Sequence, residues 1–564
     1  MAGSWHPARS GGGQPELLSW GPWIAVLFAC LPYALGFPQG DDGGREAVRI
    51  AEYLHALEDG QYPPYWASNF YGGYGSPVFL YYAPLFSFVA AVLSKLLGSF
   101  AAGGTLAACF FTAVSAVSMH ALMREILGRG DAAAEAAARI SVYLYVLSPY
   151  LMVDKFVRGA NAEFTALAIL PIVLLGLMRI GREPLQGVLI LSSGLALVIL
   201  AHNLTALIAL ALLTLATVVL YRPWDGTGWR GLGYVALGVA FGFALSAFFW
   251  WPLIVFLPGV RMGDLTGLFA LDAFMTPLAL FGTGHPFTFG PFIPFILVLA
   301  VMIYFQGKVE GRTQQVLLFA LSTAGLSLFL QWPISLPLWE SIEALKVFQF
   351  PWRMMGVLAL VSAMAGGMIV YAWGQVWTNR SRGVLEYLIL ALVVSVAIMG
   401  LMRTLPFIWR LDMSLEGLSA HAVRERDVRA TSRHEYLPPG AQLESRSPPS
   451  QVEIRAGDRL EAVILACREG GEMALTVDLN EPRSLRFPVW GADVWAVRLN
   501  GRGVAYRTDE IGSMEVDLPA GHHEVRLRSR PPRARVWGVG VSMAAWGLWL
   551  ALAMQGWRQR RETT

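Results

Sequence analysis

Two adjacent carboxylates, Asp41 and Asp42, follow the first apolar stretch of the chain and are the first side chains that could do chemistry. A carboxylate at the edge of an apolar region is partly desolvated, which raises its pKa and suits it to accept a proton from a hydroxyl group. The alternative is structural, because Asp is a favoured N-cap residue and a helix is predicted to follow. The residues alone leave both interpretations open.

A second polar cluster has four ionisable groups within ten residues, Asp154, Lys155, Arg158 and Glu163. Arg158 could bind a phosphate, whereas Asp154 or Glu163 could bind a sugar hydroxyl or a divalent cation. The alternative is a network of salt bridges at a helix end that neutralises itself.

Polar residues also interrupt two later apolar stretches. His202 and Asn203 lie within the stretch 195–215, at a depth where polar side chains usually face a cavity. The alternative is a structural histidine with a local hydrogen bond. Trp352 and Arg353 begin another apolar stretch. A guanidinium at that depth needs an anion such as a lipid phosphate, unless the side chain extends to ordinary lipid headgroups.

The composition places these clusters in a membrane protein. Of 564 residues, 55% are hydrophobic and only 15% are charged, and the mean hydropathy is +0.49. About a quarter of the residues are charged in a typical soluble protein. The net charge of +3 is too small to indicate nucleic-acid binding. Three cysteines predict neither a disulfide framework nor a thiolate metal site, and the sequence has no nucleotide-binding motif.

Twelve apolar stretches are long enough to predict transmembrane helices, which need about 20 residues each. They are centred near residues 29, 115, 143, 171, 194, 213, 245, 297, 323, 364, 393 and 546. The stretch 81–97 is shorter, has Pro84 near its start and carries Lys95, so we expect a helix that lies in the membrane interface.

The distribution of Lys and Arg predicts which ends of these helices face the cytoplasm. The segments on one side hold 15 Lys and Arg in about 70 residues, whereas the opposite loops hold 8 in about 130. Because cytoplasmic loops are enriched in cations, both termini are predicted to be cytoplasmic. All four polar clusters then lie on the extracytoplasmic side.

The region 405–533 has a different pattern from the rest of the chain. Runs such as 459–465 and 494–500 alternate apolar and polar residues, with Pro and Gly turns between them. Short alternating runs of this kind predict an antiparallel β-sandwich. The predicted organisation is a cytoplasmic leader 1–19, a transmembrane domain 20–404 with a large external loop 38–103, the β-sandwich 405–533, a last helix 534–557 and a cytoplasmic tail 558–564.

Seven short motifs occur in an order that resembles a known family. They are Asp42, Tyr62 to Trp66, Gly73 to Pro77, Tyr82 to Leu85, Arg158 to Glu163, His202 with Asn203, and Phe350 to Arg353. The chain is similar to bacterial membrane proteins labelled 6-pyruvoyl-tetrahydropterin synthase-related. More widely, it resembles the GT-C superfamily of integral-membrane glycosyltransferases. Two features depart from the pattern: one extra residue precedes Trp66, and Glu46 stands where relatives often carry His. No three-His zinc site for pterin chemistry is present in the sequence.

The resemblance implies a GT-C-like polytopic α-helical fold in a bacterial inner membrane. It also implies transfer of a sugar from a polyprenyl-phosphate donor to a glycan, lipid or protein acceptor on the extracytoplasmic face, in cell-envelope glycan biosynthesis. Asp42 would be the catalytic base, with Asp41 as the second candidate. The substrate-binding residues would be Glu46, Arg49, Tyr74, Asp154, Arg158, Glu163, His202, Asn203, Trp352 and Arg353. The resemblance implies no definite cofactor, and a divalent cation is a further hypothesis for the site.

Two other functions fit parts of the sequence. A transporter or flippase for a lipid-linked glycan should show inverted repeats with broken helices near the membrane centre, and no such pairing is evident. A non-catalytic envelope-assembly protein would use the β-sandwich to bind a partner and would tolerate the loss of Asp42. The sequence does not specify the sugar or the acceptor.

Overall fold

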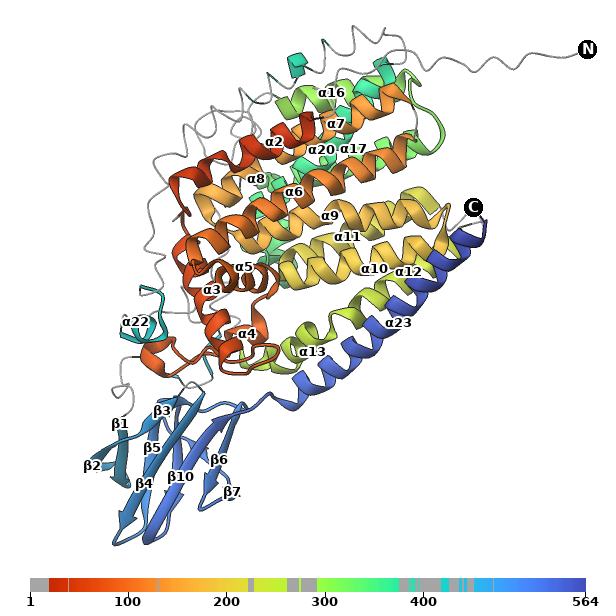
Figure 1. The fold of residues 1–564 in the computed structure, drawn as a ribbon. Coiled ribbons are helices and arrows are strands. Elements are labelled where there is room, and N and C mark those ends of the chain that lie inside the picture. Colours follow the sequence, from red (N-terminus) through yellow and green to blue (C-terminus); the bar gives the residue numbers. More distant parts are fainter. Residues whose placement is uncertain are drawn as a thin grey trace, which may run out of the picture.

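The computed structural model describes most of the chain beyond its first 19 residues. The described residues are 20–38, 40–128, 131–221, 228–260, 273–274, 292–374, 384, 387–389, 391, 394, 417–425, 436–438, 441–443, 451–469 and 471–563. Within them the protein consists of a helical bundle followed by a β-domain and one more long helix (Figure 1).

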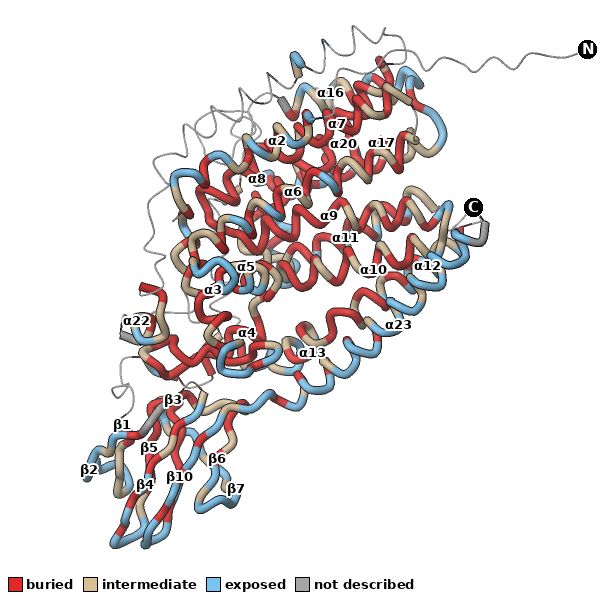
Figure 2. Tube along the Cα trace, viewed as in Figure 1, coloured by how far each residue is buried: buried red, intermediate tan, exposed pale blue. Residues whose placement is uncertain are grey.

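Seven helices of the described part are long and apolar enough to cross a membrane. They are α6 (Phe100–Leu127), α9 (Asn161–Ile180), α10 (Pro184–Ala201), α11 (Asn203–Tyr221), α17 (Gly311–Gln331), α20 (Met354–Gly374) with the preceding turn η8 (Pro351–Arg353), and α23 (Arg533–Thr563). Helices α9 and α20 are almost wholly buried inside the bundle, whereas α23 lies at its edge with most side chains exposed (Figure 2). An exposed apolar helix of this length is suited to contact lipid.

Two bent helix pairs bring the number of spans in the described residues to as many as nine. One pair joins α7 (Ala132–Val146) to α8 (Pro149–Val153) and η3 (Asp154–Arg158), and is bent by 40°. The other joins α12 (Trp229–Leu245) to α13 (Ala247–Phe256) and η5 (Leu257–Gly259), and is bent by 77°.

The predicted spans can now be compared with these helices. Two shorter apolar helices, α2 (Gly21–Cys30) with η1 (Leu31–Leu35) and α16 (Phe292–Phe305), cover the predicted spans near residues 29 and 297. The span predicted near residue 393 lies outside the described residues, apart from a few isolated positions. Each of the remaining nine predicted spans falls on one of the seven helices or two bent pairs. The helical membrane fold is therefore confirmed, although the count of twelve spans is not.

The loop after α2 folds into short helices at one end of the bundle. They are α3 (Gly43–Glu58), η2 (Tyr71–Gly73), α4 (Val78–Tyr81) and α5 (Leu85–Leu97). Helix α5 has 13 residues and is therefore about 20 Å long, too short to cross an apolar layer of about 30 Å. Its Lys95 pairs with Glu58 of α3, so the two helices are tied together at this end.

The β-domain contains two five-stranded antiparallel sheets in the described residues, with strand orders β2-β1-β5-β9-β8 and β3-β4-β10-β6-β7. Alternate residues of β4 and β10 are buried, as expected for strands that cover a core on one face. The strands are β1 (Gln451–Ala456), β2 (Arg459–Leu465), β3 (Cys467–Glu469), β4 (Glu472–Leu479), β5 (Arg483–Trp490), β6 (Trp495–Leu499), β7 (Arg502–Val504), β8 (Arg507–Thr508), β9 (Ser513–Leu518) and β10 (Gly521–Ser529). The predicted β-region before the last helix is thus confirmed. Residues 405–450 are described only in part and include α22 (Ala420–Glu425).

Aromatic side chains fasten the β-domain to the loop that follows α3. The ring of Tyr74 lies 4.6 Å from that of Trp490, and the ring of Trp66 lies 5.4 Å from that of Trp495. The backbone N–H of Trp490 also donates to the carbonyl of Tyr74 at 3.2 Å. The first large loop and the β-domain therefore lie at the same end of the bundle, which Figure 1 shows.

Candidate active site

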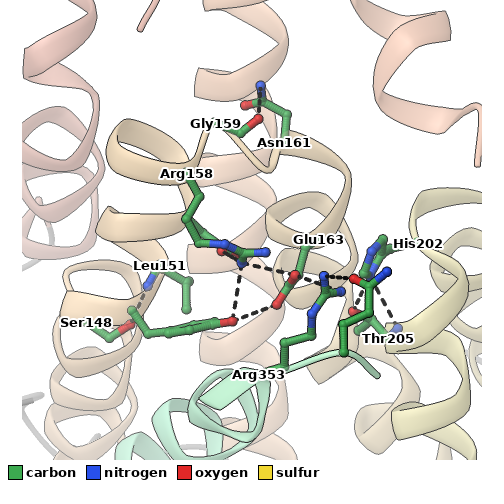
Figure 3. A network of polar contacts seen from close by, with 12 residues as sticks. Ser148, Leu151, Arg158, Gly159, Asn161, Glu163, His202, Thr205 and Arg353 are labelled. Atoms are coloured by element: carbon green, nitrogen blue, oxygen red, sulfur yellow. Dashed lines mark hydrogen bonds and ion pairs between the residues drawn. The ribbon is translucent and has the colours of Figure 1, made fainter. Parts of the chain in front are cut away.

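The second polar cluster of the sequence forms a tight turn between α8 and α9. Residues Asp154–Arg158 make one π-helical turn, η3, which ends at Gly159 in the left-handed conformation (φ +68°). Single π turns inside helical segments are often found at functional sites. A Cβ atom on Gly159 would lie 2.5 Å from the backbone nitrogen of Gly43, so only glycine fits here. The turn directs Arg158 toward Glu163 in the first turn of α9 (Figure 3), and Arg158 also pairs with Asp154.

Four buried side chains form the centre of this site. The Nη1 group of Arg158 donates to Asp154 and, at 3.0 Å, to Oε2 of Glu163. The hydroxyl of Tyr150 donates to Oε1 of Glu163 at 2.7 Å and lies 3.4 Å from Nη1 of Arg158. All four residues are at most 7% exposed. The guanidinium of Arg158 thus pairs with both carboxylates, although Oδ2 of Asp154 is buried without a hydrogen-bond partner among the described residues.

Arg353 approaches the same carboxylate from the beginning of α20. Its Nη1 lies 3.4 Å from Oε2 of Glu163, and its Nη2 donates to Gln349 at 3.0 Å. Although Arg353 is only 9% exposed, its Nε and Nη1 have no hydrogen-bond acceptor among the described residues. The side chain therefore does not extend to ordinary headgroups, and it retains donors that an additional anion could use.

The neighbouring residues hold this arginine and Arg158 in place. The guanidinium of Arg158 lies 4.6 Å from the ring centre of Trp352, a distance at which cation–π attraction is significant. The ring of Trp352 stacks on Phe350 with centroids 4.9 Å apart. Gln349 has a left-handed backbone (φ +66°), a conformation that costs a non-glycine residue about 1 kcal/mol or more. The stacked rings hold the turn before Arg353 and so maintain the strained backbone of Gln349.

The first pair of carboxylates lies directly beside η3. The backbone N–H of Asp41 donates to the carbonyl of Val157 at 3.0 Å, and the backbone N–H of Asp42 donates to the backbone carbonyl of Arg158 at 2.7 Å. A Cβ atom on Gly40 would lie 2.6 Å from the same Val157 carbonyl. The close backbone approach therefore depends on glycine, and it brings two clusters that are more than 100 residues apart in the sequence to one place.

The side chain of Asp42 is accessible rather than buried. Asp42 occupies the N-cap position of α3, but its carboxylate makes no capping hydrogen bond. Instead it lies 3.1 Å from Nη1 of Arg45 and is 49% exposed. Partial burial and the adjacent negative charge of Asp42 raise the pKa of the Asp41 carboxyl above its ordinary value. Both carboxylates could be reached by a substrate at this end of the bundle.

A second buried ion pair lies on the same helix. Arg49 donates to Oε1 of Glu46 at 2.5 Å, and the hydroxyl of Tyr82 donates to the same oxygen at 2.6 Å. The guanidinium also lies 3.8 Å from the centre of the Tyr82 ring. Burial raises the pKa of the Glu46 carboxyl, against the opposing effect of Arg49. Oε2 of Glu46 and Nε of Arg49 are buried without a hydrogen-bond partner in the described residues.

The remaining predicted site residues lie at the edge of this arrangement or outside it. Nδ1 of His202 lies 2.9 Å from the Thr205 hydroxyl, with the imidazole beside Glu163 and Arg353 in Figure 3. Asn203 donates to the carbonyl of Tyr81 at 2.8 Å and so ties α11 to α4. Tyr74 is buried against the β-domain.

Two members of the network carried no distinguishing signal in the sequence. Tyr150 is one of many aromatic residues in apolar segments, and its part in the site depends on the turn that brings Glu163 toward it. Gln349 lies just before the Trp352–Arg353 motif, but its contact with Arg353 needs the left-handed backbone that only the structure shows.

The acidic side chains of the site were also candidates to bind a divalent cation. Among the described residues, no group of three or more His, Cys, Asp or Glu side chains could hold a metal ion. Asp154 and Glu163 both bind Arg158, whose guanidinium takes the place that a cation would need between them. These two carboxylates do not form a ready cation site, so a divalent cation remains a prediction without a described set of ligands.

The fold and site define a polytopic helical membrane protein with a buried ion network at one end of its bundle. Residues 79–408, more than half of the chain, match the family model described as 6-pyruvoyl-tetrahydropterin synthase related domain; membrane protein. The chain belongs to this family, as its motifs predicted. No curated protein matches it by sequence.

Several solved structures are similar to the chain at low sequence identity. The arabinofuranosyltransferase AftD from Mycobacteria is 15% identical, with 71% of this chain and 28% of that chain covered and a TM-score of 0.44. ArnT from Cupriavidus metallidurans, bound to undecaprenyl phosphate, is 14% identical, with coverage of 73% and 77% and a TM-score of 0.41. The oligosaccharyltransferase of Archaeoglobus fulgidus in its apo form is 12% identical, with coverage of 74% and 56% and a TM-score of 0.40. The chain thus spans little more than a quarter of the length of AftD.

Proposed function

We propose that the protein is an integral-membrane glycosyltransferase. It transfers a sugar from a polyprenyl-phosphate donor to an acceptor on the extracytoplasmic face of the membrane. The observation that carries this proposal is that two groups of charged side chains lie close together at one end of the bundle. One is a buried pair of guanidinium groups, Arg158 and Arg353, and the other is an accessible pair of carboxylates, Asp41 and Asp42.

The arginines supply what a donor phosphate needs. Departure of the sugar leaves negative charge on the phosphate, and fixed cations in a dry site stabilise that charge strongly. Arg353 has unused donors on Nε and Nη1, while Arg158 is positioned by Trp352 and its two carboxylates. We assign Arg353 to direct binding of the phosphate. Arg158 stabilises the same negative charge from the other side of Glu163.

The carboxylates supply the proton acceptor. In an inverting transfer the acceptor hydroxyl must lose its proton as it attacks the sugar carbon, so a base has to lie on the open side of the site. Asp42 is the candidate because its carboxylate is half-exposed and its backbone is anchored to Arg158. Asp41 shares this anchoring through Val157 and is the second candidate.

Donor recognition can be tested with lipids that differ only in the phosphate. The full-length protein in nanodiscs should bind a short-chain polyprenyl phosphate more tightly than the matching polyprenol. The preference should shrink in Arg353→Ala. Equal binding of the two lipids by the wild-type protein would contradict the assignment of the arginines.

Transfer can be tested in proteoliposomes that contain a labelled polyprenyl-phosphate sugar and an extract of envelope glycans. The proposal predicts release of polyprenyl phosphate and appearance of the label in a second molecule. Movement of the labelled lipid between leaflets without transfer would instead identify a flippase.

A further inference from the structure

A buried carboxylate of α3 attaches the first large loop to that helix, and it does not take part in the ion network of the candidate site. Glu52 is 1% exposed. Its Oε1 accepts a hydrogen bond from the side-chain amide of Asn69 at 2.8 Å, and its Oε2 accepts one from the backbone N–H of Asn69 at 3.1 Å. Both carboxylate oxygens of Glu52 thus bind the same residue of the loop.

His55 is the cationic partner available to this carboxylate. Its Nδ1 lies 3.0 Å from Oε1 of Glu52, and its side chain is 16% exposed. No Lys or Arg side chain lies within ion-pair distance of Glu52 in the described part of the chain. A buried carboxylate is costly unless a positive charge accompanies it. Protonation of His55 therefore supplies the charge that Glu52 otherwise lacks.

Other charged groups near His55 act in the same direction. Although burial lowers the pKa of the imidazole, the carboxylate of Glu52, and after it those of Glu58 and Asp59, raise this pKa above its ordinary value. The imidazole is thus surrounded by carboxylates, which favour its protonated form.

The helices packed against α3 bring no further charge to this pair. Lys95 of α5 pairs with Glu58. Helix α22 carries His421 and Arg424, and neither lies within ion-pair distance of Glu52. The charged residues of α6 lie near its far end.

The loop segment that Glu52 binds is closed by its own hydrogen bonds. The side chain of Gln61 accepts from the backbone N–H of Trp66 and donates to its carbonyl, both at 3.0 Å. Ala67 and Ser76 exchange backbone hydrogen bonds of 2.8 and 2.9 Å. The carbonyl of Tyr74 in this segment accepts from the β-domain. A change at Asn69 is therefore transmitted to the whole segment 66–76.

We propose that Glu52 and His55 form a pH-sensitive anchor for the first large loop. With His55 protonated, the pair holds segment 66–76 against α3. Loss of the proton leaves Glu52 buried without a positive partner, and the attachment of the loop weakens.

The direction of the pH effect follows from linkage between protonation and folding. Contacts in the folded protein raise the pKa of His55 above its value in an unfolded chain. The stabilisation is therefore fully present below the ordinary pKa of histidine, about 6.5, and is lost as the pH rises through the higher value of the folded protein. The loop is held more firmly at mildly acidic than at alkaline pH.

The anchored segment connects α3 with the β-domain, since Tyr74 and Trp490 pack against each other. Helix α3 begins directly after Asp42. An effect of pH on sugar transfer rests on the proposed function. The attachment of the loop does not, and it can be measured without an activity assay.

The experiment measures hydrogen exchange by mass spectrometry on the full-length protein in nanodiscs, at about pH 6 and about pH 8.5, on either side of the range in which histidine titrates. After correction for the intrinsic pH dependence of exchange, protection of residues 66–76 should fall by at least about threefold at the higher pH. His55→Gln should show the lower protection at both pH values, because Gln cannot take up a proton. Constant protection in the wild-type protein would overturn the proposal, as would an equal fall in His55→Gln.

Two further variants separate this pair from other histidines and from misfolding. His522→Gln is the matched control, because its imidazole lies 2.7 Å from Asp478 in a pair that is mostly exposed on the β-domain. It should keep the full pH dependence, and a loss there would overturn the assignment to His55. Glu52→Gln keeps the size of the side chain but removes its charge, so the pH dependence should disappear even if His55→Gln does not fold. An unchanged pH dependence in Glu52→Gln would also overturn the proposal.

Discussion

At the scale of single residues, the site depends on how many partners each charge has. Arg158 is satisfied by Asp154, Glu163 and the face of Trp352, whereas Arg353 shares Glu163 and keeps two nitrogen atoms without an acceptor among the described residues. The two arginines are therefore not equivalent. In the proposed site Arg353 binds the phosphate directly, whereas Arg158 acts on the same charge from the other side of Glu163.

This difference predicts the effect of Arg353→Ala. We expect binding of polyprenyl phosphate to weaken by roughly 2–4 kcal/mol, because a charged hydrogen bond to a phosphate is lost in a poorly hydrated site. Titration of the lipid into protein in nanodiscs measures this change. Arg182→Ala is the control, since its half-exposed side chain pairs with Glu125 near the other end of α9. Unchanged affinity in Arg353→Ala would exclude this residue from the phosphate site.

At the scale of elements, the π turn η3 and the beginning of α3 depend on one glycine. Gly159 has φ +68°, and a methyl group there would lie 2.5 Å from the Gly43 nitrogen. Gly98 has nearly the same backbone (φ +62°) with open space around it. The two positions separate the cost of the left-handed backbone from the cost of the steric clash.

We expect Gly98→Ala to lower stability by about 1 kcal/mol and to leave transfer intact, because only the backbone preference is lost. Gly159→Ala should cost more and should also lower the transfer rate, since the first loop must move away from η3. Thermal unfolding and transfer assays on both variants measure this. The same effect of both substitutions would mean that the contact between Gly159 and Gly43 is unimportant.

Most of the helices and strands, and several residues of the candidate site, could be predicted from the sequence. Apolar length indicated the helices, alternation indicated the strands, and the order of motifs singled out Asp42, Arg158, Glu163 and Arg353. The packing could not be predicted in this way. Glu46 and Arg49 pair with each other beneath Tyr82, and Tyr74 contacts Trp490 of the β-domain. These partners are set by tertiary contacts between distant segments, which hydrophobic patterns do not encode.

At the scale of the whole molecule, the β-domain packs on the same loop that leads to the candidate active site. Trp490 is fully buried, with its ring against Tyr74. Trp490→Ala should therefore remove a large apolar contact, worth about 3–5 kcal/mol in a typical core. We expect faster hydrogen exchange in residues 60–77, measured by mass spectrometry. Trp537→Ala is the control, because that side chain is 73% exposed on α23. Unaltered exchange in the loop would show that the β-domain does not stabilise it.

The orientation of the molecule in the membrane is a prediction of the cation distribution. Single cysteines can be placed at Asp59, Arg182 and Arg502 after the native cysteines are replaced by Ser. Asp59→Cys and Arg502→Cys should react with an impermeant maleimide from outside the cell, and Arg182→Cys only after the membrane is opened. Labelling of Asp59→Cys and Arg182→Cys from the same side would contradict the predicted topology.

The central claim is that Asp42 removes the proton from the acceptor while Arg353 holds the donor phosphate. The most direct test is a pair of measurements on Asp42→Asn, namely donor binding and the rate of sugar transfer, with Asp41→Asn as the matched control. Loss of a general base lowers a rate by roughly 10²- to 10⁴-fold and leaves donor affinity nearly unchanged. We predict this result for Asp42→Asn and a smaller loss for Asp41→Asn. Transfer by Asp42→Asn at the wild-type rate would contradict the account.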